Sequence, residues 1–292
     1  MINRGLTFAK HHTPSSVRVA ARWAMLEGRN VRSRLTVPVA TRCEYDAVYH
    51  CTLRKTASQW VKALLHDPVV YRYSGLLPFD QRVHRRRYPD AIPPGRVASS
   101  LFISYKRFSA IRKPENHRAF FIMRDPRDIV VSSYFSLRGS HTPMGDILEH
   151  RKVLQELPFK EGMIHVIGHL KETWLFTQLR GWVTAPSDET FRLFRYEDLI
   201  GEHQTDEMAE LMRHCGISIP PPELEALLDR HSFSRKRGGD AGTLSHYRKG
   251  QAGDWRNHFD DDIYEAFIAA TGDLVELCGY PSREQLRSVE DV

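Results

Sequence analysis

The chain has 292 residues, of which 41% are hydrophobic and 27% are charged; this is typical of a globular protein and excludes an intrinsically disordered one. Its formal net charge of +6 fits anionic ligands but does not distinguish nucleic acid, nucleotide and lipid. The four cysteines form no C-x-x-C pair, which argues against a structural zinc site and favours a reducing, cytoplasmic location. We find no apolar run long enough to span a bilayer and no secretory signal.

The first 42 residues are basic, with Glu27 as their one acid, and we treat residues 1–42 as a basic N-terminal segment ahead of a domain over residues 43–292. The spacing of Trp23 and Leu26 predicts a short helix within residues 17–26. A basic amphipathic segment can rest on an anionic membrane surface. Because its apolar part is short, we favour a helix packed on the domain or a loose arm.

The stretch from Ala47 to Asp67 reads as a buried strand, a tight turn and a helix with one apolar stripe. Such a turn leaves backbone N–H groups unpaired at a helix N-terminus, where the helix dipole adds positive charge. The turn, LRKTAS, therefore predicts an anion site, most naturally for a phosphate, formed by Arg54, Lys55, Thr56 and Ser58. It does not match the Walker A pattern, which needs two glycines, because this turn has no glycine and Lys55 precedes Ser58 by three positions. A βα turn that binds nothing stays open as the alternative.

Residues 71–94 read as a long irregular excursion that could shape a substrate pocket, and residues 97–105 as a second strand followed by a short helix over 108–111. Phe120 to Met123 then forms a continuous apolar run, as in a strand buried on both faces. Asp125 can cap the next helix, with a proline at its first position. This places Arg124 at the carboxyl end of a strand, where open α/β sheets bind ligands. A local ion pair between Arg124 and Asp125 is the alternative.

The second half of the chain predicts further helices and one more strand. Residues 136–160, which contain His141, read as a loop with a short helix inside. Residues 161–183 carry apolar side chains at helical spacing and read as core, including Ile164 and Trp174. We then predict a strand over 191–194, helices over 203–215 and 221–230, a mobile polar stretch over 234–246, and a final helix over 262–278. Arg248 and Lys249, before Gly250, can fold over a phosphate or form a solvated turn.

Four separated segments, TLRKTASQW, RDPRDIVVSSYF, FRYEDLI and YRKGQAGDWRNHF, together resemble the ordered motif set of the cytosolic-type sulfotransferases. The resemblance covers residues from about Asp46 to Tyr280. It implies a single α/β domain with a central parallel sheet flanked by helices, related to P-loop kinases. It also implies 3′-phosphoadenosine 5′-phosphosulfate (PAPS) as sulfonate donor, the bisphosphate PAP as product, and no metal.

The resemblance gives a role to each matching residue. Lys55 falls on the lysine that contacts the 5′-phosphosulfate and stabilises the leaving phosphate, and Arg124 with Ser132 keeps the spacing of the 3′-phosphate clamp. The other matches are Thr56, Ala57, Ser58 and Gln59 for the phosphosulfate cradle, Trp60, Tyr196 and Phe233 for the adenine side, and Arg248, Lys249 and Gly250 for the loop that closes over the 3′-phosphate.

The chain departs from the family at the catalytic histidine, whose position is taken by Ser100 in the segment VASSLF. A serine cannot act as a base unaided, and we name His141 as the candidate base because its loop follows the clamp helix. Ala57 replaces the loop glycine of the family.

The sequence therefore predicts transfer of a sulfonate from PAPS to a hydroxyl or amine of a small-molecule, lipid or carbohydrate acceptor, with no nucleic-acid partner. A P-loop kinase-like phosphotransferase and a non-catalytic protein that binds adenosine bisphosphate are the alternatives. The acceptor and the oligomeric state stay open.

Overall fold

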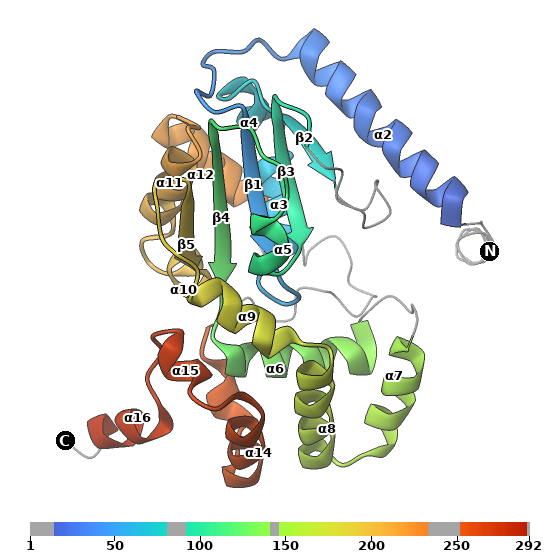
Figure 1. Cartoon of the computed structure of the whole chain (residues 1–292), viewed down its shortest axis with the longest axis vertical. Coiled ribbons are helices and arrows are strands. Elements are labelled where there is room, and N and C mark those ends of the chain that lie inside the picture. The colour runs from blue at the N-terminus through green and yellow to red at the C-terminus, as the bar shows by residue number, and fades with distance from the viewer. Residues whose placement is uncertain (1–14, 81–91, 141–145, 233–251, 291–292) are drawn as a thin grey trace.

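The computed structural model describes residues 15–80, 92–140, 146–232 and 252–290 and is built around one five-stranded sheet (Figure 1). The strands are β1 (Ala47–Thr52), β2 (Leu77–Asp80), β3 (Arg96–Phe102), β4 (His117–Met123) and β5 (Phe191–Arg195). Their order is β2-β3-β1-β4-β5, and every neighbouring pair is parallel. All five carboxyl ends therefore meet at one edge of the sheet, which confirms the predicted α/β fold.

Helices precede, connect and follow these strands. Up to β5 they are α2 (Ser15–Thr36), α3 (Ser58–Leu65), α4 (Pro68–Arg72), α5 (Tyr105–Ser109), α6 (Pro126–Phe135), the π-helical turn η2 (Ser136–Ser140), α7 (Ile147–Glu156), α8 (Phe159–Glu172) and α9 (Leu175–Val183). After β5 come α10 (Tyr196–Ile200), α11 (Gln204–His214), α12 (Pro221–Arg230), the 3₁₀ turn η3 (Asp254–Asn257), α14 (Asp261–Thr271), α15 (Leu274–Leu277) and α16 (Arg283–Glu290).

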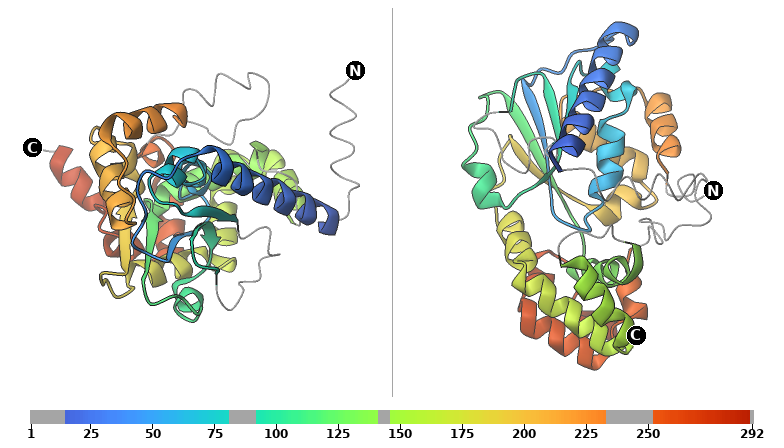
Figure 2. Two further views of the ribbon diagram at one scale, coloured as in Figure 1. Left: turned by 90° about the horizontal axis from the view of Figure 1, so that it is seen from above. Right: turned by 90° about the vertical axis from the view of Figure 1, so that its right-hand side faces the viewer.

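The sheet separates two apolar clusters, because successive residues of a strand point to opposite faces. Val48 of β1 packs with Trp60 of α3 and with residues of α11 and α12. Tyr49 packs on the other face with residues of α5, α6, α8, α9 and α14. Figures 1 and 2 show the helices α6, α7, α8 and α14 as a layer beyond the carboxyl ends of the strands. The edge where we predict the ligand thus lies between the sheet and this layer.

The helix α2 is longer than predicted and lies beside β2 at the edge of the sheet (Figure 1). Asn30 is buried there, and its amide donates to the backbone oxygen of Pro78 at 3.2 Å. Trp23, predicted on the apolar side, is 51% exposed. No helix in the described ranges combines the length and the apolar character needed to cross a bilayer.

Several predicted boundaries are wrong. The segment over 71–94 contains the edge strand β2, and β3 ends at Phe102, before the helix α5 rather than one over 108–111. The apolar stretch over 161–183 is divided into α8 and α9 at Trp174, which has a left-handed φ of 60°. Trp174 and Ile164 were assigned to the core and are exposed. The predicted final helix over 262–278 is likewise divided into two helices, α14 and α15.

Candidate active site

The turn between β1 and α3 has an unusual backbone. Lys55 and Ala57 both adopt the left-handed conformation, with φ of 71° and 61°. The buried Thr56 hydroxyl lies within hydrogen-bond distance of the Leu53 oxygen, at 3.1 Å, and of Thr52 Oγ1, at 2.9 Å. The Thr56 side chain therefore holds the turn together. Such a turn, at the start of a helix, forms a concave surface of N–H groups that suits an anion.

Arg124 reaches this turn from the end of β4. Its Nη1 donates to the backbone oxygen of Lys55 at 3.3 Å, although the two residues are 69 positions apart. Its guanidinium lies 4.6 Å from the ring centroid of Tyr196, the first residue of α10. The local ion pair between Arg124 and Asp125, which was the alternative for these residues, does not form: Asp125 pairs with Arg127, and Arg124 lies 3.9 Å from Asp128. Three of the predicted motifs thus meet at the carboxyl edge of the sheet.

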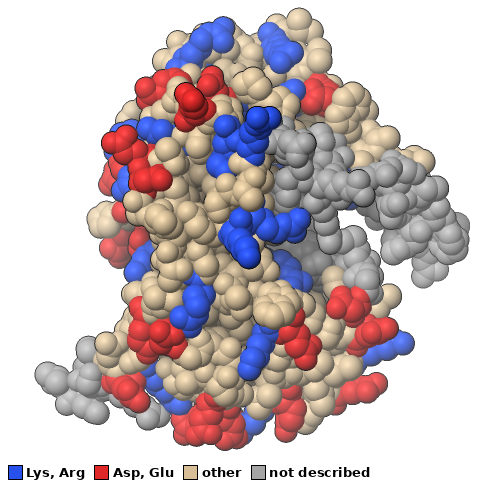
Figure 3. Space-filling view, in the orientation of Figure 1, with Lys and Arg blue, Asp and Glu red and all other residues tan. Residues whose placement is uncertain are grey.

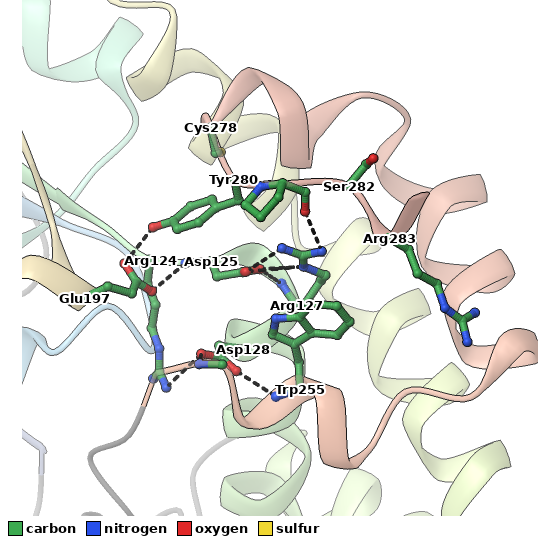
Figure 4. Close-up of polar contacts among 12 residues, drawn as sticks. Arg124, Asp125, Arg127, Asp128, Glu197, Trp255, Cys278, Tyr280, Ser282 and Arg283 are labelled. Atoms are coloured by element: carbon green, nitrogen blue, oxygen red, sulfur yellow. Dashed lines mark hydrogen bonds and ion pairs between the residues drawn. The ribbon is translucent and has the colours of Figure 1, made fainter. Parts of the chain in front are cut away.

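Three acidic side chains lie near Arg124, of which Asp125 and Asp128 are buried and Glu197 is half-buried (Figure 4). Asp125 caps α6, as predicted, by accepting the N–H of Arg127, and it also accepts three hydrogen bonds from the Arg127 guanidinium. Glu197 accepts the N–H of Asp125 at 3.1 Å and the hydroxyl of Tyr280 at 2.6 Å. Burial raises the pKa of the Glu197 carboxyl, although these two hydrogen bonds oppose that shift.

Asp128 joins this network to the fourth motif. Its carboxylate accepts the backbone N–H of Gly253 at 2.7 Å and of Trp255 at 2.9 Å. Burial raises the pKa of Asp128, while Arg124 and the two N–H groups lower it. The Trp255 ring in turn stacks 3.8 Å from the Arg127 guanidinium. The first turn of α6 therefore anchors the segment that directly follows the predicted 3′-phosphate loop.

An open cavity of about 430 Å³ lies beside this network. Its walls come from α10 and from the segment that Asp128 anchors, and they consist of Glu197, Ile200, Gly201, Ala252, Gly253, Asp254 and Asn257. On the face drawn in Figure 3, basic side chains run through the middle of the molecule, at the height where the sheet meets the lower helices. This distribution suits an anionic ligand at the carboxyl edge.

Ser100 cannot replace the family's histidine in the arrangement seen here. It has a left-handed φ of 59°, it is buried, and its hydroxyl donates to the backbone oxygen of Ser58 at 3.0 Å. Its backbone N–H lies 3.4 Å from Nδ1 of the buried His50. This hydroxyl thus links β3 to the start of α3.

The other predicted site residues differ in how far the structure describes them. Gln59 is exposed, Ser132 is half-buried on α6, and Trp60 is buried in the same apolar cluster as Tyr196. His141, Phe233, Arg248, Lys249 and Gly250 lie outside the described residues. Sequence reasoning missed Asp128, Glu197 and Tyr280. For Asp128 the sequence carried a signal, because an acid inside a largely apolar helix such as α6 needs a buried partner.

Comparison with known proteins adds to this geometry. The family description "Sulfotransferase domain" matches residues 100–279, which is more than half of the chain. The chain belongs to the sulfotransferase domain family. The match begins after the Lys55 turn and includes β4, α6, β5 and the segment that Asp128 holds.

Curated relatives of this sulfotransferase-family chain are distant and match in part. A guinea pig protein named 3-alpha-hydroxysteroid sulfotransferase is 27% identical over 57% of this chain and 58% of its own. Mouse sulfotransferase 2A2 is 28% identical over 51% of this chain and 53% of its own. The chain thus spans little more than half the length of these relatives. A crystal structure of mouse sulfotransferase SULT7A1 complexed with PAP has a TM-score of 0.58 and 16% identity, and it covers 83% of this chain and 91% of that one. This likeness supports the fold.

Proposed function

We propose that this protein transfers a sulfonate group from PAPS to a hydroxyl or amine of a small-molecule acceptor. The observation that carries the proposal is the meeting of Arg124 with the Lys55 turn, at 3.3 Å and beside the Tyr196 ring. PAPS carries phosphate groups at both the 3′ and the 5′ position of its ribose, and binding it needs two cationic sites. The family membership and the resemblance of four motifs point to the same donor.

Each side chain has a distinct task in this proposal. The turn around Thr56 holds the 5′-phosphosulfate by its backbone N–H groups, and the Lys55 ammonium stabilises the charge that grows on the phosphate oxygen as the bond from sulfur to that oxygen breaks. Arg124 and Ser132 hold the 3′-phosphate, with Arg248, Lys249 and Gly250 closing over it. Ala57, Ser58 and Gln59 complete the cradle of the phosphosulfate, and Trp60, Tyr196 and Phe233 position the adenine. The protein then contributes mainly positioning and electrostatic stabilisation, as in phosphoryl transfer.

The acceptor must lose a proton when its oxygen or nitrogen bonds to sulfur. Because the Ser100 hydroxyl is buried and donates to Ser58, we assign proton removal to His141. A His141→Ala variant with unchanged turnover would remove that assignment. The guinea pig relative is named for hydroxysteroids, so these alcohols are the first acceptors to test.

The test compares Lys55→Ala with Arg124→Ala, using calorimetric PAP binding and turnover of labelled PAPS. Lys55→Ala should lose most turnover, on the order of 100-fold, because one charge contact to a developing anion typically contributes that much. Arg124→Ala should mainly weaken PAP binding, by roughly 10-fold or more, because it removes one charged hydrogen bond.

Arg213→Ala is the matched control, because Arg213 is an exposed arginine that pairs with Glu210 on α11. It should leave both quantities unchanged. The proposal fails if wild-type protein binds PAP no better than AMP. Turnover with ATP and magnesium in place of PAPS would favour a phosphotransferase, and PAP binding without turnover on any acceptor would favour a non-catalytic protein.

A further inference from the structure

Two helices beyond the carboxyl edge of the sheet bring four polar side chains together. Asp146 and His150 are four residues apart at the start of α7, and His165 and His169 are four residues apart on α8. This spacing places both members of a pair on one helix face. The rings of His150 and His169 have centroids 4.0 Å apart, so the two faces meet.

We propose that Asp146, His150 and His169 bind one zinc ion. Potential ligand atoms from these three residues all lie within 4.8 Å of one another. Asp146 Oδ2 and His150 Nε2 are 3.5 Å apart. Ligand bonds of 2.0–2.2 Å in tetrahedral geometry would place such atoms about 3.4 Å apart, so small side-chain rotations complete the site. Imidazole and carboxylate ligands suit zinc, and three of them leave the fourth position for water.

His165 supplies the contact that a metal-binding histidine usually has. His150 Nδ1 lies 3.0 Å from His165 Nε2, on the ring side opposite Asp146. In the tautomer in which Nδ1 carries the hydrogen, His150 donates to His165 and directs its Nε2 lone pair at the metal. His165 is thus a positioning residue and not a ligand.

The position of the site gives it a structural consequence. Among the side chains of α7, Leu154 alone is buried, and Leu148 is 50% exposed, so apolar packing holds this helix weakly. A metal shared with α8 would fix it. The site also lies one helical turn from Thr173, whose hydroxyl accepts from Arg54 Nη2 at 2.9 Å. Zinc would therefore fix α7 and α8 relative to the Lys55 turn.

The test treats the full-length protein with a chelator and titrates it with Zn²⁺ by calorimetry and with Co²⁺ by visible absorption. Wild-type protein should bind one ion per chain, with a dissociation constant below about 1 μM, and Zn²⁺ should raise its melting temperature by binding only the folded state. Asp146→Asn, His150→Gln and His169→Gln should each weaken binding by roughly 100-fold or more. His165→Gln should weaken it by about 10- to 100-fold.

His258→Gln is the matched control, because His258 also pairs with an aspartate four residues earlier, Asp254, at 3.3 Å. It should bind zinc as the wild type does. The melting temperature of each metal-free variant shows whether it folds. If His169→Gln does not fold, the zinc affinity of Asp146→Asn tests the proposal, because Asp146 is exposed. The proposal is overturned if wild-type protein binds no stoichiometric zinc, or if the ligand variants bind it as well as the control. If the wild-type protein binds no metal and His169→Gln nevertheless loses sulfonate transfer, the cluster would act in proton transfer, and the zinc proposal would equally be rejected.

Discussion

At the scale of single residues, the Lys55 turn depends on backbone conformations that side chains disfavour. Ala57 has a φ of 61°, in the left-handed region where a Cβ costs about 1–2 kcal/mol relative to glycine. The cytosolic-type sulfotransferases that the sequence resembles have glycine at this position. The chain keeps the turn with alanine because the buried Thr56 hydroxyl and the start of α3 fix the backbone around it.

This strain predicts that Ala57→Gly stabilises the protein. The released strain exceeds the additional entropy of glycine in the unfolded chain, so the free energy of unfolding should rise by about 0.5–1 kcal/mol, measured by urea denaturation. Ala110→Gly is the matched control, because Ala110 is exposed and right-handed, with φ of −79°, and there the same change should be destabilising. Equal effects at the two positions would show that Ala57 is unstrained in solution.

At the scale of elements, Asp128 connects α6 to a segment 125 residues later. Both of its carboxylate oxygens accept backbone N–H groups, from Gly253 and Trp255, and the side chain is buried. Trp255 also packs on Arg127, which donates to the Pro281 oxygen at 3.0 Å. The helix that carries the predicted 3′-phosphate clamp thus also holds the C-terminal part of the domain.

We therefore expect Asp128→Asn to weaken both stability and donor binding. An amide has one accepting oxygen, so one buried N–H loses its partner and faces an NH₂ group. The free energy of unfolding should fall by roughly 2–4 kcal/mol, and the PAP dissociation constant should rise. Asp261→Asn is the control: its exposed carboxylate pairs with Arg283 on the surface, and both quantities should stay close to wild type. Unchanged PAP affinity in Asp128→Asn would mean that this anchor does not position the 3′-phosphate loop.

The elements that sequence predicted correctly are those whose local signals agree with their burial. β4 contains a continuous apolar run, and β1 is a short buried run of mostly apolar or β-favouring residues. α6 follows a capping aspartate and has a proline at its first helical position. β2 was missed because it is four residues long and contains Pro78, which an edge strand tolerates. The break at Trp174 was missed because the left-handed turn there uses no glycine, so apolar spacing continued across it.

In the candidate site, too, residues with a local sequence signal were predicted and contacts between distant segments were not. Arg124 was placed correctly because a strand followed by a capped helix fixes where its last residue lies. The partners of Asp128 and Glu197 were not predictable, since they come from segments up to 127 residues away and no local pattern pairs them. The histidine cluster was missed for a similar reason: each i, i+4 pair is unremarkable alone, and only the packing of α7 on α8 joins them.

At the scale of the whole molecule, the sheet buries an ionisable group that the proposed chemistry does not use. His50 lies in the centre of β1, stacked on Phe120 with ring centroids 4.9 Å apart. Its Nδ1 lies 3.1 Å from the Ser99 hydroxyl, which can donate to it. Burial lowers the pKa of His50 from 6.5 to about 3. The folded protein therefore keeps this imidazole neutral at pH values at which the unfolded chain protonates it.

This difference predicts a specific loss of stability in acid. Between about pH 6.5 and pH 3 the unfolded chain binds one more proton at His50 than the folded protein, so the free energy of unfolding falls as the pH falls, by up to about 1.4 kcal/mol per pH unit. His50→Asn keeps an acceptor near the Ser99 hydroxyl but does not titrate. Its free energy of unfolding, measured with urea in the presence of EDTA, should therefore fall less steeply with decreasing pH than that of the wild type, by up to about 1.4 kcal/mol per pH unit. His203→Asn, the same substitution at an exposed histidine, is the matched control for the change of side chain. If His50→Asn and wild type lose stability in parallel from pH 6.5 to pH 4, burial in the sheet does not keep the His50 imidazole neutral, and the prediction is wrong.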